Sequence, residues 1–250
     1  MGKFDGKVAL VTGSGRNIGR ATVLKLAAEG ANVVVNARSN QQEVDGVVRE
    51  ARELGVKAIG ILADMADKEA VEAMAAKALS EFGRVDILVN NAAIRPHKPF
   101  VTVSDADWEL VRGVVLDGAF YLTRALIGKM AENKYGRVLF FVGDGAYSGR
   151  GSGRAHLSAA KMGLIGLARG LASEFAPDNI RVNVVSPGSI NTTRTNPEWY
   201  GNRPPDSAGI PLGRQGKIEE IADTCIFLIG DESGFITGQT IHANGGVGYY

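Results

Sequence analysis

The sequence predicts a single doubly wound α/β domain, in which a seven-stranded parallel sheet carries helices on both faces. Two observations lead to this fold class. Short runs of apolar and β-branched residues recur along the chain, and they are continuous rather than alternating, as in strands that are buried on both faces. Amphipathic segments of helix length separate these runs, and such strand–helix–strand repetition implies parallel strands with right-handed crossovers.

The expected strands follow the apolar runs in chain order. They cover residues 7–12, 32–36, 57–62, 85–90, 137–142, 181–185 and 239–242 and read KVALVT, NVVVN, KAIGIL, VDILVN, RVLFFV, RVNVV and QTIH. Between them, helices are expected at 17–29, 41–54, 67–81, 104–132, 155–176 and 217–228. No linker divides the 250 residues, so we expect one domain over 1–250. The segment near 189–216, rich in Pro, Gly, Asn and Arg, is expected to be a substrate loop.

Composition and charge argue against several classes of partner. The formal net charge is +1, which offers no electrostatic footprint for nucleic acid or an anionic membrane. No segment approaches the roughly 18 uninterrupted apolar residues of a membrane span. Cys225 is the only cysteine, which excludes an internal disulfide and fits a reducing compartment. We therefore expect a cytoplasmic protein that acts on a small molecule, with no nucleic-acid or membrane partner and no metal site.

A glycine-rich turn joins the first expected strand to the first expected helix. Such a turn lets the backbone approach a pyrophosphate closely, while the helix N-terminus supplies free N–H groups and the positive end of a dipole. The strand before the turn and the helix after it are the context that a Rossmann-type dinucleotide site requires. The expected contacts in the turn are Gly13, Gly15, Arg16, Asn17, Ile18 and Gly19.

The end of the second strand indicates which dinucleotide binds. Folds that prefer NAD place an acidic residue there to accept from the ribose 2′-hydroxyl. This strand ends Val35-Asn36-Ala37-Arg38-Ser39 and has no carboxylate. Arg38, and Arg16 in the glycine turn, can instead pair with a 2′-phosphate through charge-assisted hydrogen bonds. We therefore expect NADP(H) as the cofactor, with NAD(H) as the weaker alternative.

Further motifs extend along the whole chain. They are Thr12-Gly13 with Gly19, Asp64, Asp86, Asn90-Asn91-Ala92, Lys161, Pro187-Gly188, Gly238 and Gly245-Gly246. In combination they resemble the short-chain dehydrogenase/reductase family, in particular its bacterial 3-oxoacyl-carrier-protein reductase-like members. The resemblance implies contacts to the adenine, the ribose and the nicotinamide amide. In that order they are Asp64 and Met65, then Asn91 and Ala92, then Pro187, Gly188, Ile190 and Thr192.

Two cofactor positions depart from the family pattern. Asn17 and Ala93 each stand where the family has glycine. Asn tolerates a positive φ better than other non-glycine residues, so we expect the first change to be mild. The second adds one methyl group near the cofactor.

The catalytic positions depart further. Family members reduce carbonyls with Asn, Ser, Tyr and Lys, and Tyr gives the proton while Lys, four residues later, lowers the Tyr pKa. Lys161 matches, but Leu157 stands at the Tyr position and Val115 at the Asn position. The Ser position falls on Gly143, or on Asp144 if an insertion precedes it, and both registers stay open. The resemblance thus implies a degraded catalytic tetrad and argues against ordinary turnover by the family mechanism.

Other polar residues near these positions are candidates for the missing chemistry. His156 adjoins the Tyr position, and Asp144, Tyr147, Asp117 and His97 lie near the missing groups. Arginines also occur on the loops that should surround the pocket mouth, and they suggest an anionic substrate such as a carboxylate or an acyl-thioester phosphate. These are Arg95, Arg150, Arg154, Arg194 and Arg203.

Three hypotheses about function follow. The first is an NADP(H)-dependent oxidoreductase with a non-standard proton donor, and it leads because the cofactor half is in good order. The second is an inactive pseudo-enzyme subunit that pairs with an active family member. We expect the chain to form either a homotetramer or a hetero-oligomer with an active family member. In both cases it would associate through helices 104–132 and 155–176. The second of these helices has small residues that allow close contact, namely Ala159, Ala160, Gly163 and Gly166. The third, a non-redox lyase or dehalogenase around Lys161, ranks last because such enzymes usually lose the dinucleotide site.

Overall fold

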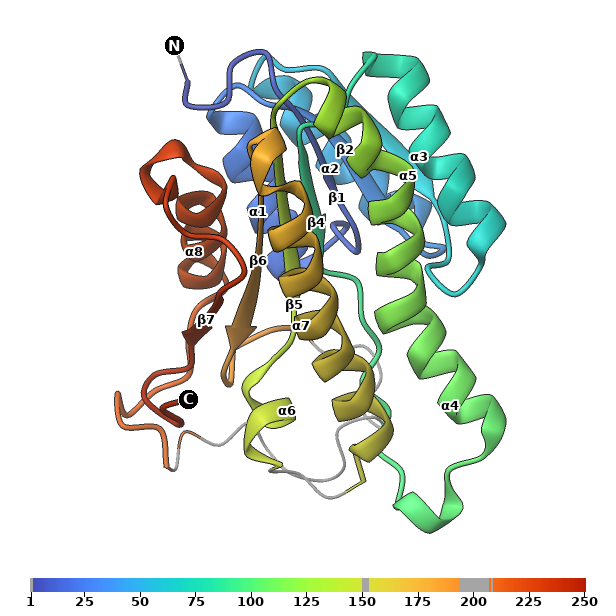
Figure 1. The fold of residues 1–250 in the computed structure, drawn as a ribbon, viewed down its shortest axis with the longest axis vertical. Helices are drawn as coiled ribbons and strands as arrows, with labels where there is room; N and C mark the ends of the chain where they lie inside the picture. Colours follow the sequence, from blue (N-terminus) through green and yellow to red (C-terminus); the bar gives the residue numbers. More distant parts are fainter. Residues whose placement is uncertain (1, 150–152, 194–206, 208) are drawn as a thin grey trace.

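The computed structural model describes residues 2–149, 153–193, 207 and 209–250. Its centre is a parallel seven-stranded sheet with the order β3-β2-β1-β4-β5-β6-β7 (Figure 1). The strands are β1 (Val8–Val11), β2 (Asn32–Ala37), β3 (Ala58–Leu62), β4 (Ile87–Asn90), β5 (Gly136–Phe141), β6 (Ile180–Pro187) and β7 (Thr240–Ala243). The predicted fold class and all of the predicted strands are confirmed, with ends that shift by one or two residues.

Helices cover both faces of the sheet. They are α1 (Asn17–Ala28), α2 (Gln41–Glu53), α3 (Lys68–Phe82), α4 (Asp105–Arg112), α5 (Gly118–Glu132), α6 (Asp144–Ser148), α7 (Ala155–Phe175) and α8 (Ile218–Ile229). Figure 1 shows α5 and α7 lying along one face. Along β1, Val8 and Leu10 join the apolar core beneath α3, α5 and α7, whereas Ala9 and Val11 join the core beneath α1, α2 and α8. Successive strand residues point to opposite faces, which is why these runs are apolar throughout.

The segment expected as one helix over 104–132 is divided, so that expectation is wrong in detail. A π-helical turn, η2 (Gly113–Asp117), separates α4 from α5. Gly118 starts α5 against the chain after β3, where a Cβ atom would lie only 2.2 Å from the carbonyl oxygen of Met65. This close approach explains the glycine, and π turns inside helices occur frequently at functional sites. The short helix α6 was also not predicted.

A buried carboxylate ties the two central strands together. Asp86 is fully buried, and its Oδ2 atom accepts a hydrogen bond from the backbone N–H of Val8 at 2.9 Å. Arg84 pairs with the same carboxylate. A buried charge is tolerated only when it is paired and hydrogen-bonded, and Asp86 meets both conditions. The first residue of β1 is thereby tied to the segment immediately before β4.

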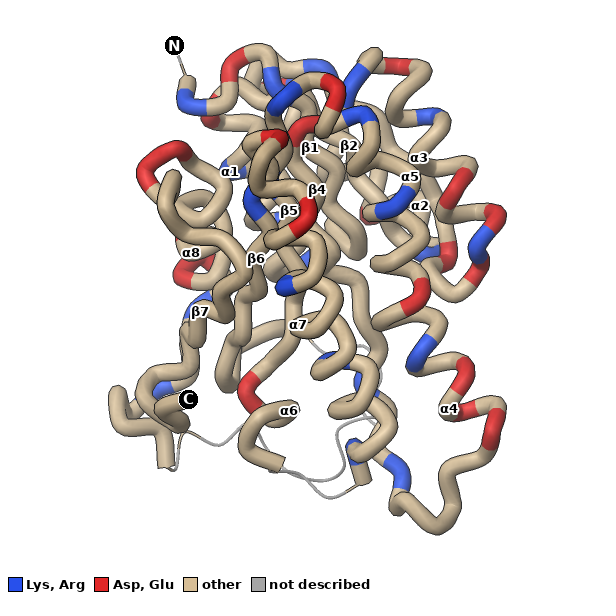
Figure 2. Tube along the Cα trace, viewed as in Figure 1, with Lys and Arg blue, Asp and Glu red and all other residues tan. Residues whose placement is uncertain are grey.

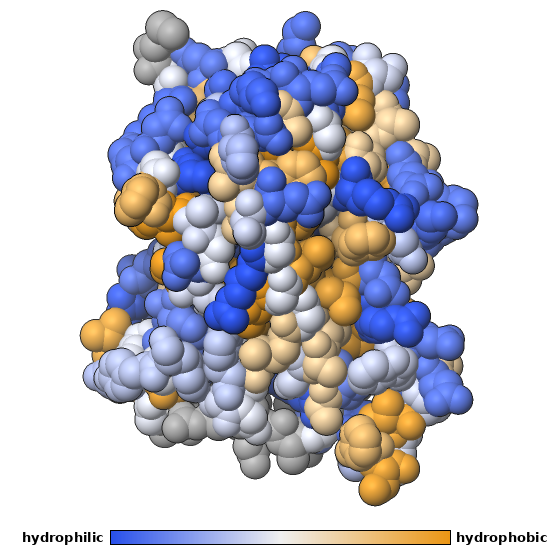
Figure 3. All heavy atoms as spheres, viewed as in Figure 1, coloured by the Kyte–Doolittle hydropathy of each residue, from blue (hydrophilic) through white to orange (hydrophobic). Residues whose placement is uncertain are grey.

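Figure 2 shows Lys and Arg positions interspersed with Asp and Glu positions along the chain. Apolar side chains protrude at several places in Figure 3, among them the turn η1 (Phe100–Thr102) before α4. Phe100 and Val101 are 70% and 92% exposed there. Among the described residues, no helix is long and apolar enough to cross a membrane.

Candidate active site at the carboxyl edge of the sheet

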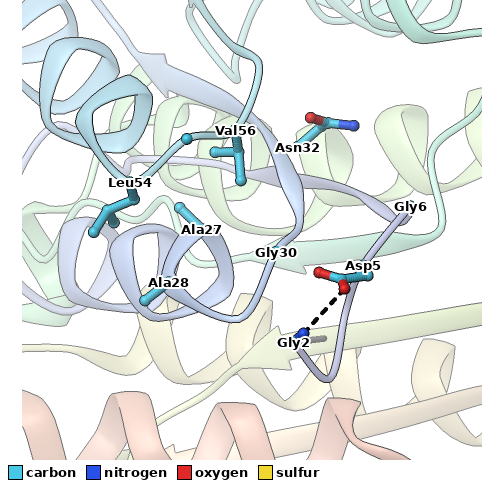
Figure 4. Close-up of a pocket in the computed structure, with 10 residues that line it drawn as sticks. Gly2, Asp5, Gly6, Ala27, Ala28, Gly30, Asn32, Leu54 and Val56 are labelled. Atoms are coloured by element: carbon cyan, nitrogen blue, oxygen red, sulfur yellow. Dashed lines mark hydrogen bonds between the residues drawn. The ribbon is translucent and has the colours of Figure 1, made fainter.

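Most of the predicted site residues lie at or just after the carboxyl ends of the strands β1 to β6, and Lys161 and His156 lie on α7. The strand order reverses between β1 and β4, and ligands of open α/β sheets bind at such a switch point. The pocket drawn in Figure 4 lies at the opposite edge, where the end of α1 and the start of β2 meet. That pocket is therefore separate from the candidate site.

Asn91 ties the two loops at the switch point together. Its Nδ2 atom donates to the carbonyl oxygens of Thr12 (2.8 Å) and Gly13 (3.1 Å). In return, Oγ1 of Thr12 accepts from the N–H groups of Asn91 (3.1 Å) and Ala92 (3.0 Å). A Cβ atom at Gly19 would lie 2.5 Å from the Gly13 carbonyl oxygen, so only glycine fits where α1 starts against the turn.

Asn36 supports the glycine turn from below, and it was not among the predicted site residues. Its Oδ1 atom accepts from Gly13 N at 3.1 Å, and its backbone exchanges hydrogen bonds with Ser14. Its Nδ2 atom donates to the carbonyl oxygens of Ile61 and Ala63 on the other side. Asn36 is 1% exposed, so these bonds satisfy an otherwise costly buried amide. The only signal in the sequence was a polar residue within an apolar run.

The N-terminus of α1 is open to an anion. Its N-cap residue Arg16 makes no side-chain cap, and the first turn has no acidic residue. By contrast, Asn40 and Asp67 cap α2 and α3 with their side chains. The first N–H groups of a helix need acceptors, and a pyrophosphate supplies them. These residues therefore fit a dinucleotide.

Asn17 joins the glycine turn to the loop that follows β6. Its φ is 49°, the left-handed conformation that Asn tolerates and glycine otherwise provides. Its Nδ2 atom donates to the Thr193 carbonyl oxygen at 3.1 Å, and its Oδ1 atom accepts from Thr193 N at 3.0 Å. The base of that loop is closed by a bridge between Ile190 and Gly216. Half of the expected substrate loop, 194–206 with 208, lies outside the described residues.

The remaining predicted cofactor contacts lie around the same edge. Arg16 and Arg38 are exposed on either side of the glycine turn. Met65 is buried and Asp64 half-buried after β3, and Ala93 is exposed after β4. The members near the end of β6 are Pro187, Gly188, Ile190 and Thr192, and they are all partly buried. At Gly188, a Cβ atom would lie 2.7 Å from the Cα atom of Asn244, so the chain passes there too closely for a side chain.

Lys161 lies at the centre of the catalytic half. Its Nζ atom donates to the carbonyl oxygen of Phe141 at 2.6 Å. Complete burial disfavours the charged ammonium, and the positive charge of Arg95 disfavours it further, so the pKa of Lys161 falls to about 7. One helical turn earlier, Leu157 is buried in the apolar core, and so is Val115 in the π-helical turn.

The two candidate serine positions point in different directions. Gly143 has a φ of 128°, which favours glycine, and a Cβ atom there would face the Pro187 carbonyl oxygen at 3.9 Å. Asp144 is buried, and its Oδ1 atom accepts from Nδ2 of Asn244 at 3.0 Å. Its carboxylate therefore faces the segment after β7.

His156 is buried without hydrogen bonds. The residue is 2% exposed, and neither ring nitrogen has a partner in the described part of the chain. Burial lowers the pKa of His156, and the charges acting on it are those of Asp107 and Lys98, which form an ion pair at the start of α4. His156 thus lies toward α4. His97 packs against the loop before α7, where a Cβ atom on Gly153 would lie 2.8 Å from its ring.

Tyr147 belongs to an aromatic cluster beside β7. Its hydroxyl donates to Oγ1 of Thr240 at 3.0 Å, and its ring centroid lies 4.6 Å from that of His242 and 5.1 Å from that of Tyr250. Burial lowers the pKa of His242, against the opposing charge of Asp144. His242 was not among the predicted site residues, because nothing local distinguishes it from other residues of its strand.

The other candidates have diverse surroundings. Asp117 accepts from Nε of Arg112 at 2.9 Å, so it forms an ion pair at the end of α4. Arg95 lies close enough to Lys161 for its charge to lower the lysine pKa. Arg150, Arg194 and Arg203 lie outside the described residues. No group of three or more His, Cys, Asp or Glu side chains gathers as a metal site within the described part of the chain.

The switch-point edge, the uncapped α1 and the buried lysine define a dinucleotide-binding oxidoreductase fold. The family model described as enoyl-(acyl carrier protein) reductase matches residues 13–248. The chain therefore belongs to the short-chain dehydrogenase/reductase family, as the motifs predicted.

Individual relatives cover nearly the whole chain. It is 39% identical over 244 residues to the 3-oxoacyl-(acyl-carrier-protein) reductase FabG of Escherichia coli (strain K12), which covers 98% of both chains. It is 38% identical over 247 residues to the (hydroxy(phenyl)methyl)succinyl-CoA dehydrogenase subunit BbsD of Thauera aromatica, which covers 97% of both. The structure of a putative short-chain alcohol dehydrogenase from Sinorhizobium meliloti 1021 superposes with a TM-score of 0.90 at 33% identity, over 97% of this chain and 96% of that one.

Proposed function

We propose that this chain is an NADP(H)-binding oxidoreductase that acts on a carbonyl or alcohol group through an atypical active site. One observation carries the proposal. The turn after β1 keeps an uncapped α1 and the hydrogen bonds of Asn91, and beside it Lys161 is buried with its Nζ atom on the Phe141 carbonyl. Selection for dinucleotide binding explains why these residues are retained together.

The nicotinamide, when bound, supplies or accepts a hydride. Residues of the chain would hold the cofactor in place. The first N–H groups of α1 would bind the pyrophosphate, and Arg16 and Arg38 would bind the 2′-phosphate. Ile190 and Thr192 stand near the end of β6, where the nicotinamide amide would lie. A φ of 128° at Gly143 strains any side chain, so Asp144 is the better counterpart of the family serine.

The reduced oxygen also needs a proton, and Leu157 has none to give. Lys161 is the donor in this proposal, because an ammonium with a pKa near neutrality releases its proton readily from a buried position. His156, Asp144 and Tyr147 are the further candidates. Each would first have to leave its present surroundings. These are a buried position near Asp107 for His156, and hydrogen bonds to Asn244 and Thr240 for Asp144 and Tyr147.

The proposed substrate is anionic, in the manner of an acyl thioester or carboxylate. Arg95 lies close enough to Lys161 for its charge to lower the lysine pKa, so it would place a positive charge near the proposed reaction centre. The names of the relatives FabG and BbsD refer to acyl-carrier-protein and CoA thioesters, which carry phosphate groups. A cytoplasmic location is part of the same proposal, and a single free cysteine fits such a reducing compartment.

The first test is a fluorescence titration of the purified chain with NADPH and, separately, with NADH. Trp108 and the reduced nicotinamide are the reporters. NADPH binding that is clearly tighter than NADH binding supports the proposal, and failure to bind either nucleotide contradicts it. Turnover of short 3-oxoacyl thioesters by the NADPH-loaded protein then tests the substrate class.

A second candidate function is an inactive subunit that pairs with an active family member. Leu157 and Val115, both buried in the apolar core, favour it, and the relative BbsD is itself named as a dehydrogenase subunit. The exposed side of α7 offers a close approach, because a Cβ atom on Gly166 would meet nothing within 4 Å. Purification from the native source decides: a second family member in the oligomer supports this function, and a homotetramer contradicts it.

A further inference from the structure

We infer that Glu43, in the first turn of α2, sets the nucleotide preference of the dinucleotide site. Its carboxylate lies against the glycine turn, where the adenosine ribose of the cofactor would sit, and opposes the two arginines. The inference rests on the proposed function, since it assumes that a nicotinamide dinucleotide binds at the carboxyl edge. Glu43 would then determine nucleotide specificity together with Arg16 and Arg38, and its charge would act against theirs.

The local structure fixes the position of Glu43. Asn40 caps α2, and its Oδ1 atom accepts from the backbone N–H of Glu43 at 3.1 Å. The side chain then leans onto the glycine turn. A Cβ atom built on Gly15 would lie 3.1 Å from the Glu43 Cβ atom, 3.2 Å from its Oε2 atom and 3.7 Å from the Ala37 Cβ atom. The carboxylate thus sits between the turn after β1 and the end of β2.

This carboxylate has spare capacity to accept hydrogen bonds. Glu43 is half-buried, and its Oε atoms have no hydrogen bond or ion pair within the described part of the chain. Its neighbours on α2 are engaged: Asp45 accepts from Gln41, and Glu50 pairs with Arg20. A half-buried acceptor beside a ribose site is suited to receive a ribose hydroxyl.

Glu43 places a carboxylate near the end of β2, where the strand itself provides no acidic residue. In folds that prefer NAD, the acidic residue that accepts from the 2′-hydroxyl follows the second strand directly. Here β2 ends at Ala37 and Arg38 follows it, but α2 returns a carboxylate to the same place. The spatial position is therefore occupied from a different point in the sequence.

Three charges then compete for the cofactor. Arg16 and Arg38 are exposed and attract the 2′-phosphate of NADPH, whereas Glu43 repels it. The 2′-hydroxyl of NADH instead donates to Glu43 and gains little from the arginines. The consequence is a site that accepts both nucleotides, with a smaller preference for NADPH than the arginines alone would produce.

The experiment compares the full chain with Glu43→Gln, which keeps the size of the side chain and removes its charge. The Asn40 cap bonds the backbone of residue 43, so the variant retains the helix start. Asp45→Asn is the matched control, since it removes one negative charge from the same helix two residues away. NADPH and NADH are titrated separately against each protein, at low and at high salt.

We expect Glu43→Gln to tighten NADPH binding and weaken NADH binding, each by about threefold to tenfold, with the NADPH gain reduced at high salt. Asp45→Asn should leave the ratio of the two affinities unchanged. A ratio in Glu43→Gln within about twofold of the parent overturns the role of Glu43 and leaves the proposed function standing. Failure of all three proteins to bind either nucleotide overturns both.

Discussion

The Nζ atom of Lys161 donates a hydrogen bond to the backbone carbonyl oxygen of Phe141 at 2.6 Å. The bond joins the N-terminal third of α7 to the last residue of β5, and it leaves a buried ammonium with a neutral partner. Burial without a carboxylate is what lowers the lysine pKa to about 7. Two of the predictions below follow from this single contact.

The first prediction concerns stability. The pKa of Lys161 is about 7 in the folded chain, whereas an ordinary exposed lysine has a pKa of 10.5. Between these values the unfolded chain binds more protons than the folded chain, so the free energy of unfolding rises with pH. The lysine contributes a slope of up to about 1.4 kcal/mol per pH unit in that window. Urea unfolding from pH 7 to 9 measures it, and Lys161→Met should remove the contribution.

The second prediction concerns the rate. If Lys161 gives the proton, carbonyl reduction at saturating NADPH falls as pH rises through about 7, because the ammonium is lost. Alcohol oxidation should show the opposite limb, since it needs the neutral amine. The pH profile of kcat measures both directions. A reduction rate that stays flat to pH 9 would exclude Lys161 and direct attention to His156, Asp144 and Tyr147, to be replaced one at a time.

The third prediction restores the family proton donor. Leu157→Tyr places a phenol one helical turn before Lys161, on the same face of α7. Because a general acid contributes about 10²–10⁴ in rate, a measurable rise in kcat for a 3-oxoacyl thioester is expected. Leu157→Phe is the matched control, since it adds the same ring without the hydroxyl. Equal rates in the two variants would show that the hydroxyl does not reach the reaction.

The fourth prediction concerns the contact between Asn17 and Thr193. Asn17→Gly keeps the positive φ and removes both hydrogen bonds, each worth about 0.5–1.5 kcal/mol. The loop after β6 should then open more often, so NADPH dissociates faster by roughly threefold to tenfold while the turn itself stays intact. Stopped-flow displacement measures the rate. Asn17→Ala adds strain at a φ of 49° and should also lower the melting temperature.

The fifth prediction tests the anchor between β1 and β4. Asp86→Ala should lower the free energy of unfolding by about 1–3 kcal/mol, because it leaves the buried Val8 N–H without its acceptor and the partly exposed Arg84 without its partner. Glu132→Ala, in the exposed pair with Lys129, should change it by no more than about 1 kcal/mol. Urea unfolding curves measure both changes. Equal decreases in the free energy of unfolding for the two variants would show that Asp86 is not an anchor between β1 and β4.

Much of the candidate site was accessible from the sequence because its determinants are local. The glycine turn needs small residues at fixed offsets, and α1 needs an uncapped start, so residues 12–19 signal their role without the rest of the chain. Lys161 was identified through a short motif on one helix. By contrast, Asn36 looked like one more strand residue, and only its buried amide between the turn and β3 shows that it positions Gly13.

The catalytic residues were harder to predict from the sequence, because their role depends on the direction in which each side chain points. Asp144, Tyr147 and His156 all lie close in sequence to the expected positions, yet they face Asn244, Thr240 and the ion pair near α4. A sequence window cannot distinguish a residue that points into a site from a neighbour that points away. The division of helix 104–132 by a π-helical turn likewise escaped the periodic pattern.

The sequence by itself determined the order of the seven strands, most of the helices between them, the parallel sheet and the position of the glycine turn. These depend on hydrophobic period and local backbone preference, which act over a few residues. Only the tertiary structure decided which side chains meet. Asn17 meets Thr193 and Glu43 meets Gly15 across long stretches of chain, because strand order and helix packing, rather than local preference, bring their atoms together.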